Sequence, residues 1–279
     1  MTVKSLATAP RPLADLPEAD ARAVIGVLTD IDDTLTTDGA ITPDALAALA
    51  GLKAAGLHVI AITGRPMGWS EPFARSVDQG GWPVDAIVAE NGAVALFREG
   101  EALTVEYAQD EPTRIRNAQR LRDVATRVLR EVPGATLARD SAGRVTDIAI
   151  DHREFARLDQ TQIDAAVAVM HEAGMNATVS SIHINGWFGE HTKLTGARWI
   201  VQRLLSQPLD ARRWIYVGDS TNDQLMFGHF PLSVGVANLL DFADALTVWP
   251  AYITEAARGA GFAEVARTFT LADHRGARP

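Results

Sequence analysis

Four short segments of the chain carry side chains that could transfer a phosphoryl group. They are residues 30–34 (DIDDT), residues 63–65 (TGR), Lys193 and residues 218–223 (GDSTND). Together they supply a carboxylate nucleophile, a second carboxylate, a hydroxyl, a cation and an acidic pair. Each segment follows an apolar run or precedes a helix-like segment, and an open parallel sheet binds its ligand at such points. The residue types and their positions therefore predict chemistry on a phosphate ester.

The first segment offers both a nucleophile and a proton carrier. Asp30 comes just after an apolar run, so its carboxylate is expected to project from the end of a strand. A carboxylate can attack phosphorus and form an aspartyl-phosphate, which splits one displacement into two easier ones. Asp32 lies two residues further on, near enough to protonate the leaving oxygen and later to deprotonate water. Asp33, in the same turn, is expected to be structural.

The second segment and the lysine add groups that can hold phosphoryl oxygens. The Thr63 hydroxyl and the Gly64 amide follow a second strand-like run and can bind such an oxygen. Arg65 can bind substrate phosphate or pair with an acidic neighbour, and the sequence leaves both possibilities open. Lys193 begins a helix-like segment, where its charge can shield the nucleophile and the phosphate from each other.

The acidic pair of residues 218–223 suits a hard cation. The segment lacks the lysine of a P-loop, so it is not that phosphate-binding motif. Asp219 and Asp223 lie at a strand-to-helix turn, and carboxylate oxygens are ligands that Mg²⁺ prefers. We predict Asp219 as a ligand of Mg²⁺, with Asp223 either binding the ion or orienting the groups that bind it. Asn222 is expected to help orient these groups or to contact the substrate.

Composition limits the classes of protein to which the chain can belong. Hydrophobic residues make up 47% of the 279 residues and charged residues 22%, as is usual for a globular protein with a real core. The net charge of −9 argues against a nucleic-acid partner, and the absence of cysteine excludes disulfides and zinc–thiolate sites. No apolar run could span a bilayer, and residues 1–22 lack the core of a secretory signal. We expect a soluble cytoplasmic protein that has no membrane partner, and the oligomeric state stays open.

Apolar runs alternate with helix-like segments in both the first and the last third of the chain. This alternation predicts a Rossmann-like, doubly wound parallel sheet of the α/β class. Strands are expected at 23–28, 58–62, 86–88, 214–217 and 232–236. Helices are expected at 43–55, 71–77 and 193–205.

The middle of the chain has a different rhythm, with hairpin-like pairs of strands and few crossovers. Strand-like runs at 93–97, 103–107, 145–151 and 177–185 alternate irregularly with helices at 113–131 and 163–173. This order predicts a small inserted α+β domain. The expected organisation is a flexible extension over 1–22, a core over 23–91 and 190–279, and the insert over 92–189.

With these segments assembled, the chain resembles the haloacid dehalogenase superfamily of phosphohydrolases, whose four motifs appear here in the family's order. The resemblance implies that Asp30 is the nucleophile and Asp32 the general acid and base. It also implies phosphate binding by Thr63 and Lys193, and Mg²⁺ binding by Asp30 and Asp219 with Asp223 beside them. In this family the metal is also bound by the main-chain carbonyl of the residue that matches Asp32.

The position of the insert and the order of its elements are similar to the C2-type cap of subfamily IIB. Residues 90–93 (ENGA) resemble that subfamily's junction between core and cap, which implies that Asn91 touches phosphate or substrate. His183, on the last strand-like run of the insert, is expected to face the substrate or to pack. The resemblance implies a Mg²⁺-dependent phosphomonoesterase for a small phosphate ester such as a sugar or polyol phosphate. A phosphohexomutase of the same fold and a non-catalytic sugar-phosphate-binding protein are the alternatives.

Overall fold

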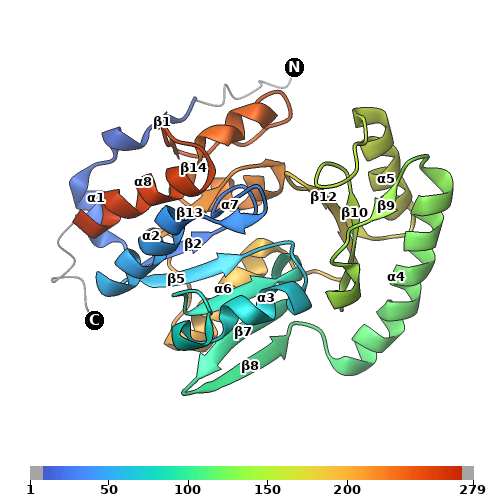
Figure 1. Cartoon of the computed structure of the whole chain (residues 1–279), viewed down its shortest axis with the longest axis horizontal. Helices are drawn as coiled ribbons and strands as arrows, with labels where there is room; N and C mark the ends of the chain where they lie inside the picture. Colours follow the sequence, from blue (N-terminus) through green and yellow to red (C-terminus); the bar gives the residue numbers. More distant parts are fainter. Residues whose placement is uncertain (1–8, 272–279) are drawn as a thin grey trace. The chain divides into compact units, whose positions relative to one another are not determined.

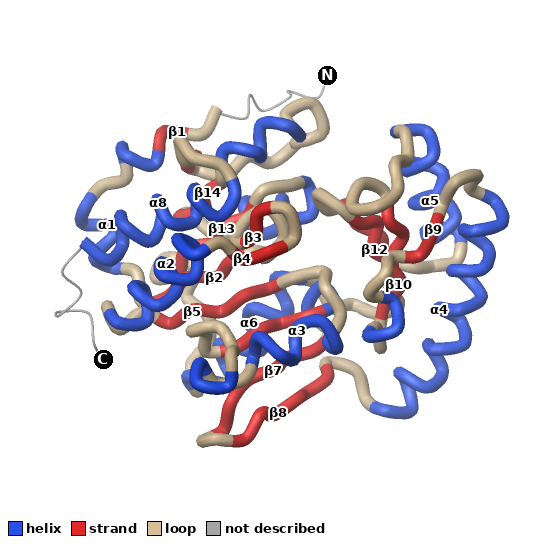
Figure 2. The backbone as a smooth tube through the Cα atoms, viewed as in Figure 1, coloured by secondary structure: helices blue, strands red, loops and turns tan. Residues whose placement is uncertain are grey.

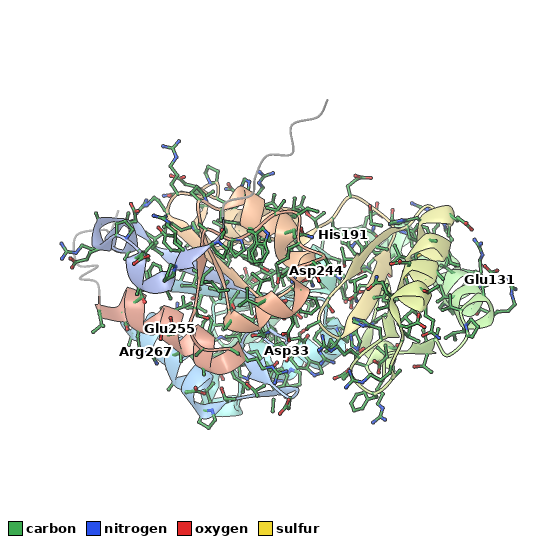
Figure 3. All side chains as sticks on the ribbon, turned by 90° about the horizontal axis from the view of Figure 1, so that it is seen from above. Asp33, Glu131, His191, Asp244, Glu255 and Arg267 are labelled. Carbon is green, nitrogen blue, oxygen red and sulfur yellow. The ribbon has the colours of Figure 1, made fainter. Side chains whose placement is uncertain are left out.

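The computed structural model describes residues 9–271, which form two compact units (Figure 1). Within that range, unit 1 comprises residues 9–61 and 207–271, and unit 2 comprises residues 62–206. Figure 2 shows helices and strands in separate colours, and Figure 3 shows the side chains. Within the described range, no helix combines the length and the apolar character that a membrane crossing requires.

Unit 1 is built on a parallel sheet, as the alternating pattern predicts. The order of its strands is β1 (Arg11–Pro12), β15 (Tyr252–Ile253), β14 (Leu232–Gly235), β13 (Trp214–Gly218), β2 (Gly26–Thr29) and β5 (His58–Ile62). Every neighbouring pair in this series is parallel. Because strands that are neighbours in the sheet are distant in the sequence, helical crossovers must connect them.

The central strand β2 brings the ends of its neighbours into line. Thr29, the last residue of β2, pairs with Val217 of β13 on one side and with Ala61 of β5 on the other. Gly218 of β13 pairs in turn with Gly235 of β14. The residues that follow β2, β13 and β14 therefore leave the sheet at one edge, where polar side chains can meet.

Helices and short turns complete unit 1. The longer helices are α1 (Glu18–Ala23), α2 (Pro43–Ala54), α7 (Gln224–His229) and α8 (Arg258–Leu271). Helix α8 packs against α2, and the two lie side by side in Figure 1. The remaining elements are η1 (Leu13–Asp15), β3 (Thr36–Thr37), β4 (Ala40–Ile41), η5 (Thr221–Asp223) and η6 (Ala237–Phe242).

Unit 2 begins with three strands that pair in an antiparallel way. Strand β6 (Ala86–Ala89) pairs with β7 (Val94–Glu99), and β7 pairs with β8 (Ala102–Tyr107). The sequence pattern assigns the β7–β8 hairpin to the insert, whereas the structure pairs it with β6. The turn η3 (Glu90–Gly92) allows this, because Glu90 and Asn91 both have positive φ and turn the chain back on β6. The helical elements here are α3 (Met67–Ala74), η2 (Val77–Gln79) and α6 (Lys193–Leu205).

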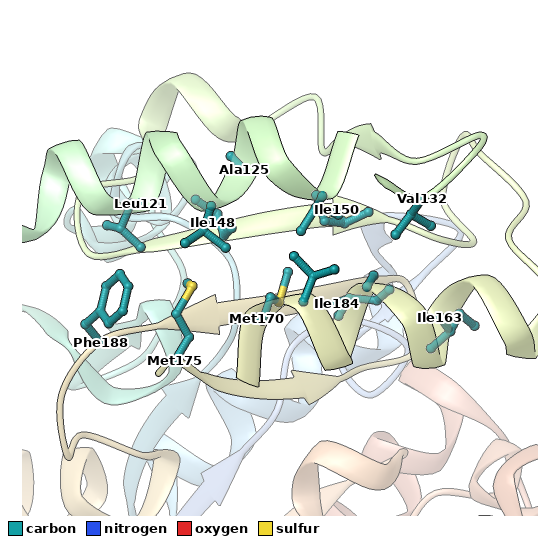
Figure 4. Close-up of a cluster of buried hydrophobic side chains, with 14 residues drawn as sticks. Leu121, Ala125, Val132, Ile148, Ile150, Ile163, Met170, Met175, Ile184 and Phe188 are labelled. Atoms are coloured by element: carbon teal, nitrogen blue, oxygen red, sulfur yellow. The ribbon is translucent and has the colours of Figure 1, made fainter. Parts of the chain in front are cut away.

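The remainder of unit 2 is an α+β segment between β8 and α6. Its antiparallel sheet has the order β11 (Asn176–Val179), β12 (His183–Trp187), β10 (Asp147–Asp151) and β9 (Thr136–Leu137). Helices α4 (Glu111–Glu131) and α5 (Gln160–Glu172) contribute to a hydrophobic cluster against this sheet (Figure 4). Ile148 and Ile150 of β10 and Ile184 of β12 belong to the cluster. Since side chains alternate along a strand, Asp147, Asp151, His183 and Asn185 lie on the opposite face.

Three boundaries differ from the sequence-based expectation. The single strand expected at 177–185 is two strands, because Ser180 accepts and donates hydrogen bonds with His183 and forms a turn between β11 and β12. Helix α3 spans Met67–Ala74 rather than 71–77; Pro66 is its N-cap residue, and Pro72 lies within it. Strand β2 begins at Gly26, because helix α1 continues to Ala23.

The N-terminal extension expected to be flexible over 1–22 lies partly outside the described residues. From residue 9 onwards it contains β1, η1 and α1. Arg11 and Pro12 pair in parallel with Tyr252 and Ile253, at the edge of the sheet where proline is tolerated. Leu13 is buried, so apolar contact also holds this segment.

The two connections of the insert meet each other. Gln109, between β8 and α4, donates a hydrogen bond from Nε2 to the main-chain oxygen of Phe188, between β12 and α6. The Gln109 side chain also accepts a bond from Asn117 of α4, over 3.3 Å. The chain therefore passes into the insert and returns from it at one place.

Candidate active site

Three buried carboxylates converge at the edge of the unit 1 sheet. Asp30 follows β2, Asp219 follows β13, and Asp223 ends the short turn η5. One carboxylate oxygen from each of the three lies within 4.8 Å of the others. Carboxylates this close repel one another unless a cation lies between them. The donor set consists of oxygen only, which fits a hard divalent cation, so the residues present could hold a metal ion.

Asp223 is held in place by its own loop. Its Oδ2 accepts hydrogen bonds from the main-chain N–H of Asp219, over 2.9 Å, and of Ser220, over 3.2 Å. Its Oδ1 accepts a hydrogen bond from the hydroxyl of Tyr216, which lies on β13. Burial, followed by the charge of Asp223, raises the pKa of Tyr216 well above its usual range, so this hydroxyl remains a donor. With donors on both oxygens, Asp223 fixes the shape of the 218–223 loop.

Both carboxylate oxygens of Asp219 accept hydrogen bonds. The hydroxyl of Thr34 donates to Oδ1 over 3.2 Å, and the side-chain amide of Asn238 donates to Oδ2 over 3.4 Å. Thr34 belongs to the first segment of the sequence pattern, whereas the sequence analysis did not identify Asn238. The available signal was its position just after the strand-like run at 232–236, at the same edge of the sheet.

Other residues of the 30–34 and 218–223 segments have different contacts. Asp32 is 9% exposed and, among the described residues, lies outside the triad of carboxylates. Asp33 has a φ of 54° and pairs with Arg258 over 3.2 Å, which agrees with a structural role. The side-chain oxygen of Asn222 accepts a hydrogen bond from Ser220 over 2.9 Å.

In unit 2, the loop after β5 is held by the loop after β6. The N–H of Thr63 donates to Val88, and the oxygen of Thr63 accepts from the N–H of Asn91 over 3.0 Å. The N–H of Glu90 donates to Arg65 over the same distance. The hydroxyl oxygen of Thr63 is fully buried and accepts from the N–H of Arg65. These bonds hold residues 63–65 and residues 90–91 against each other.

Arg65 has acidic neighbours. Its guanidinium pairs with Glu154 over 2.9 Å and with Asp140 over 3.2 Å. Glu154 also accepts a hydrogen bond from His183 Nε2 over 2.9 Å. Burial raises the pKa of Glu154, but the bonds from His183 and Arg65 outweigh it and hold the pKa at about 2. Of the two roles left open for Arg65, the structure shows pairing with acidic groups, and Glu154 links Arg65 to His183.

Gly64 is bound from the insert. Its main-chain oxygen accepts hydrogen bonds from Arg144, over 2.9 Å, and from the side-chain amide of Asn185, over 3.3 Å. Arg144 also forms an ion pair with Asp147, over 2.8 Å. Burial raises the pKa of Asp147 to about 7, although its pairing with Arg144 favours the charged form. The sequence analysis did not identify Arg144, because a lone arginine in a loop carries no distinctive pattern.

Asn91 has a buried donor without a partner. Its Nδ2 makes no hydrogen bond within residues 9–271, and its side chain is 2% exposed. A Cβ atom on Gly64 would lie 3.3 Å from this nitrogen, so the amide lies against the 63–65 loop. An unpaired buried N–H is costly, and an anionic oxygen at this loop would satisfy it.

Lys193 is the first residue of α6 and is 4% exposed. The helix is capped by Thr192, whose side chain accepts from the N–H of Thr195. The start of α6 lies against η3, because a Cβ atom on Gly92 would lie 2.0 Å from the main-chain oxygen of Thr192. Unit 2 thus brings the predicted residues Thr63, Gly64, Asn91 and Lys193 onto loops that contact one another.

Comparisons with known proteins bear on the family and on the fold. Residues 27–120 match the sequence profile of the haloacid dehalogenase-like hydrolase family. No curated protein is significantly similar in sequence to this chain.

Several solved structures share the fold. A protein of Thermoplasma acidophilum has a TM-score of 0.66 at 17% identity, with 89% of this chain and 99% of that chain covered. The sucrose-phosphatase of Synechocystis sp., solved with sucrose and phosphate, has a TM-score of 0.63 at 18% identity, with 88% and 98% covered. A sugar phosphatase of haloacid dehalogenase subclass IIB has a TM-score of 0.60 at 15% identity, with 88% and 98% covered. The expected fold is confirmed, and residues 27–120 match the profile of the family that the four motifs resemble.

Proposed function

We propose that this chain is a haloacid dehalogenase-like hydrolase, a Mg²⁺-dependent phosphomonoesterase that works through an aspartyl-phosphate. The observation that carries the proposal is the convergence of the Asp30, Asp219 and Asp223 carboxylates within 4.8 Å of one another. A structural turn gains nothing from three buried like charges, whereas a site that binds a cation and a phosphate needs them. When bound, Mg²⁺ would neutralise charge on the phosphoryl group and on its nucleophile.

The first step uses the two aspartates of the DIDDT segment. A carboxylate oxygen of Asp30 attacks phosphorus, and the bond from phosphorus to the ester oxygen breaks. Asp32, in its protonated form, gives its proton to the departing alkoxide, which leaves as an alcohol. In the second step Asp32 takes a proton from water, and the water oxygen attacks phosphorus. The bond between phosphorus and Asp30 then breaks, which releases inorganic phosphate and restores the enzyme.

Other residues are assigned to binding. Thr63, the Gly64 amide and Lys193 are proposed to hold the non-bridging phosphoryl oxygens, as the resemblance implies. The unpartnered amide of Asn91 supports a similar role for that residue. Asn222 and Asp223 are proposed to orient the acidic loop, and their contacts with Ser220 support this.

The substrate is proposed to be a small phosphate ester, with a sugar or polyol as its alcohol. Two proteins of the same fold are a sucrose-phosphatase and a sugar phosphatase, which supports this choice. We propose that the α+β segment between β8 and α6 acts as the cap that selects the alcohol, with Arg65 and His183 among the contacts. The cytoplasm, where such esters occur, is the proposed location.

A panel of phosphate esters, assayed with Mg²⁺ and with EDTA, tests the proposal. We expect Mg²⁺-dependent release of inorganic phosphate from at least one sugar or polyol phosphate. Asp30→Asn should reduce that release by at least about 10³-fold, because the amide cannot form the covalent intermediate. Asp33→Asn is the matched control from the same turn, and it should retain activity within a few-fold.

Three outcomes would contradict the proposal. Undiminished turnover by Asp30→Asn would exclude the aspartyl-phosphate. Conversion of a hexose monophosphate into its isomer, with no release of phosphate, would indicate a mutase. Tight binding of esters without turnover of any of them would indicate a binding protein.

A further inference from the structure

Asn238 lies where it can control the geometry of the acidic triad. It belongs to η6, directly after β14, and the N–H of Val236 donates to Gly218 over 3.0 Å. The loop after β14 is thereby attached to the end of β13, from which Asp219 projects. None of the four segments of the sequence pattern contains Asn238.

Hydrogen bonds determine which way the Asn238 amide points. Its Oδ1 accepts from the main-chain N–H of Arg258 over 2.8 Å. An N–H donor requires an acceptor opposite it, so Nδ2 must lie on the other side of the amide. There Nδ2 donates to the main-chain oxygen of Asp33 over 3.0 Å and to Asp219 Oδ2 over 3.4 Å. The amide therefore bonds to the DIDDT turn and to the acidic loop at once.

The N–H that orients Asn238 comes from a well-anchored helix. Arg258 is the first residue of α8 and has a φ of 55°, in the left-handed region that is unusual for a residue other than glycine. Phe262, Val265 and Phe269 of the same helix are fully buried. Packing of α8 thus holds the position of this N–H and, through it, the rotation of the Asn238 amide.

On the other side of Asp219, Thr34 donates to Oδ1 over 3.2 Å. Each oxygen of Asp219 therefore accepts a hydrogen bond from a neutral side chain, Thr34 on one side and Asn238 on the other. A carboxylate held at both oxygens pays little entropy when it binds an ion, because its rotamer is already fixed.

We propose that Asn238 is a positioning residue for the metal site, which holds Asp219 in its ligating rotamer and ties it to the DIDDT turn and to α8. The inference rests on the proposed Mg²⁺ site. It assigns no contact between Asn238 and substrate. Loss of such a partner of a metal ligand usually weakens metal binding by about 10–100-fold.

Two variants and one control test the proposal by Mg²⁺ titration calorimetry without substrate. Asn238→Ala removes the amide, and Asn238→Leu removes it while keeping a side chain of similar volume. Both should raise the Kd for Mg²⁺ by at least about 10-fold. Arg258→Ala keeps the N–H that binds Asn238 and loses only the ion pairs to Asp33 and Asp38, so its Kd should stay within about 2-fold of the wild type.

A second readout separates positioning from a general structural role. In the phosphatase assay, the Mg²⁺ concentration for half-maximal activity should rise in both Asn238 variants, while kcat at saturating Mg²⁺ changes by only a few-fold. Partial unfolding would lower kcat and leave the half-saturating concentration unchanged, and this result would overturn the inference.

The calorimetry also distinguishes this inference from the proposed function. If the wild type binds Mg²⁺ and both Asn238 variants bind it within 2-fold of the wild type, the role of Asn238 is overturned and the phosphatase proposal stands. If the wild type binds no Mg²⁺, the metal-dependent function is overturned and the inference falls with it.

Discussion

His191 is buried beside Trp187, and neither of its ring nitrogens finds a hydrogen-bond partner in the described part of the chain (labelled in Figure 3). Burial lowers its pKa to about 4. The folded protein therefore takes up this proton less readily than the unfolded chain does. The stability that follows is fully present above the unfolded pKa of about 6.5 and is lost as pH falls from there towards 4.

We expect His191→Phe to remove this part of the acid sensitivity. The wild type should lose roughly 3 kcal/mol more than His191→Phe between pH 7 and pH 4, as judged by urea unfolding. Phenylalanine can still pack on Trp187 and carries no proton. The control is His171→Gln, an exposed histidine of α5, which should follow the wild type. Equal losses in the wild type and in His191→Phe would refute the assignment.

Reactive side chains were easier to predict from the sequence than the residues that form hydrogen bonds or ion pairs with them. Asp30, Asp219 and Asp223 were recognisable because reactive side chains follow strand-like runs, and the structure brings them together. Glu154 and Asn238 were not, because their importance depends on partners distant in the sequence, Arg65 and Asp219. A partner of that kind leaves no local pattern, so only the folded chain reveals it.

Among the secondary-structure elements, η3 and α6 approach closely at a glycine. Gly92 has a φ of +107°, and a Cβ there would lie 2.0 Å from the Thr192 main-chain oxygen. We expect Gly92→Ala to lower the free energy of unfolding by at least about 2 kcal/mol, since the backbone at Thr192 would have to move as well. Its activity should also fall, because α6 begins with Lys193.

Gly100→Ala is the matched control, measured by the same urea titration. Gly100, in the β7–β8 hairpin of the same unit, also has a positive φ, of +65°, but nothing lies within 4 Å of a Cβ there. Its cost is backbone strain alone, about 1 kcal/mol. If the two variants are equally stable, the close approach of η3 and α6 does not matter for stability.

Hydrophobic periodicity predicted most of the helices and strands, but it did not predict which strands pair with each other. Helix α2 begins at Pro43 after the N-cap Thr42, and β5 spans His58–Ile62, both as predicted. The β11–β12 hairpin was missed because Ser180 and Ser181 are compatible with a continuous strand. Its turn depends on the Ser180 hydroxyl, which accepts from the N–H of His183. Strand partners are chosen by tertiary contacts, which a one-dimensional pattern does not contain.

For the protein as a whole, the acidic triad predicts stabilisation by Mg²⁺. An ion that binds only the folded state adds about 2.7 kcal/mol at 100 times its Kd. We therefore expect Tm to rise by several degrees when Mg²⁺ replaces EDTA. Asp219→Asn should lose most of this rise and should be more stable than the wild type in EDTA, since one buried like charge is gone. If the Tm of the wild type is the same in Mg²⁺ and in EDTA, this result would count against a metal site.

The hydrogen bond between Gln109 and Phe188 bears on how such a protein can evolve. An inserted segment whose two ends are in contact can change its length at little entropic cost. Such junctions also tolerate the exchange of one inserted module for another. Selection could therefore replace residues 110–187 while the proposed catalytic aspartates of unit 1 stay as they are.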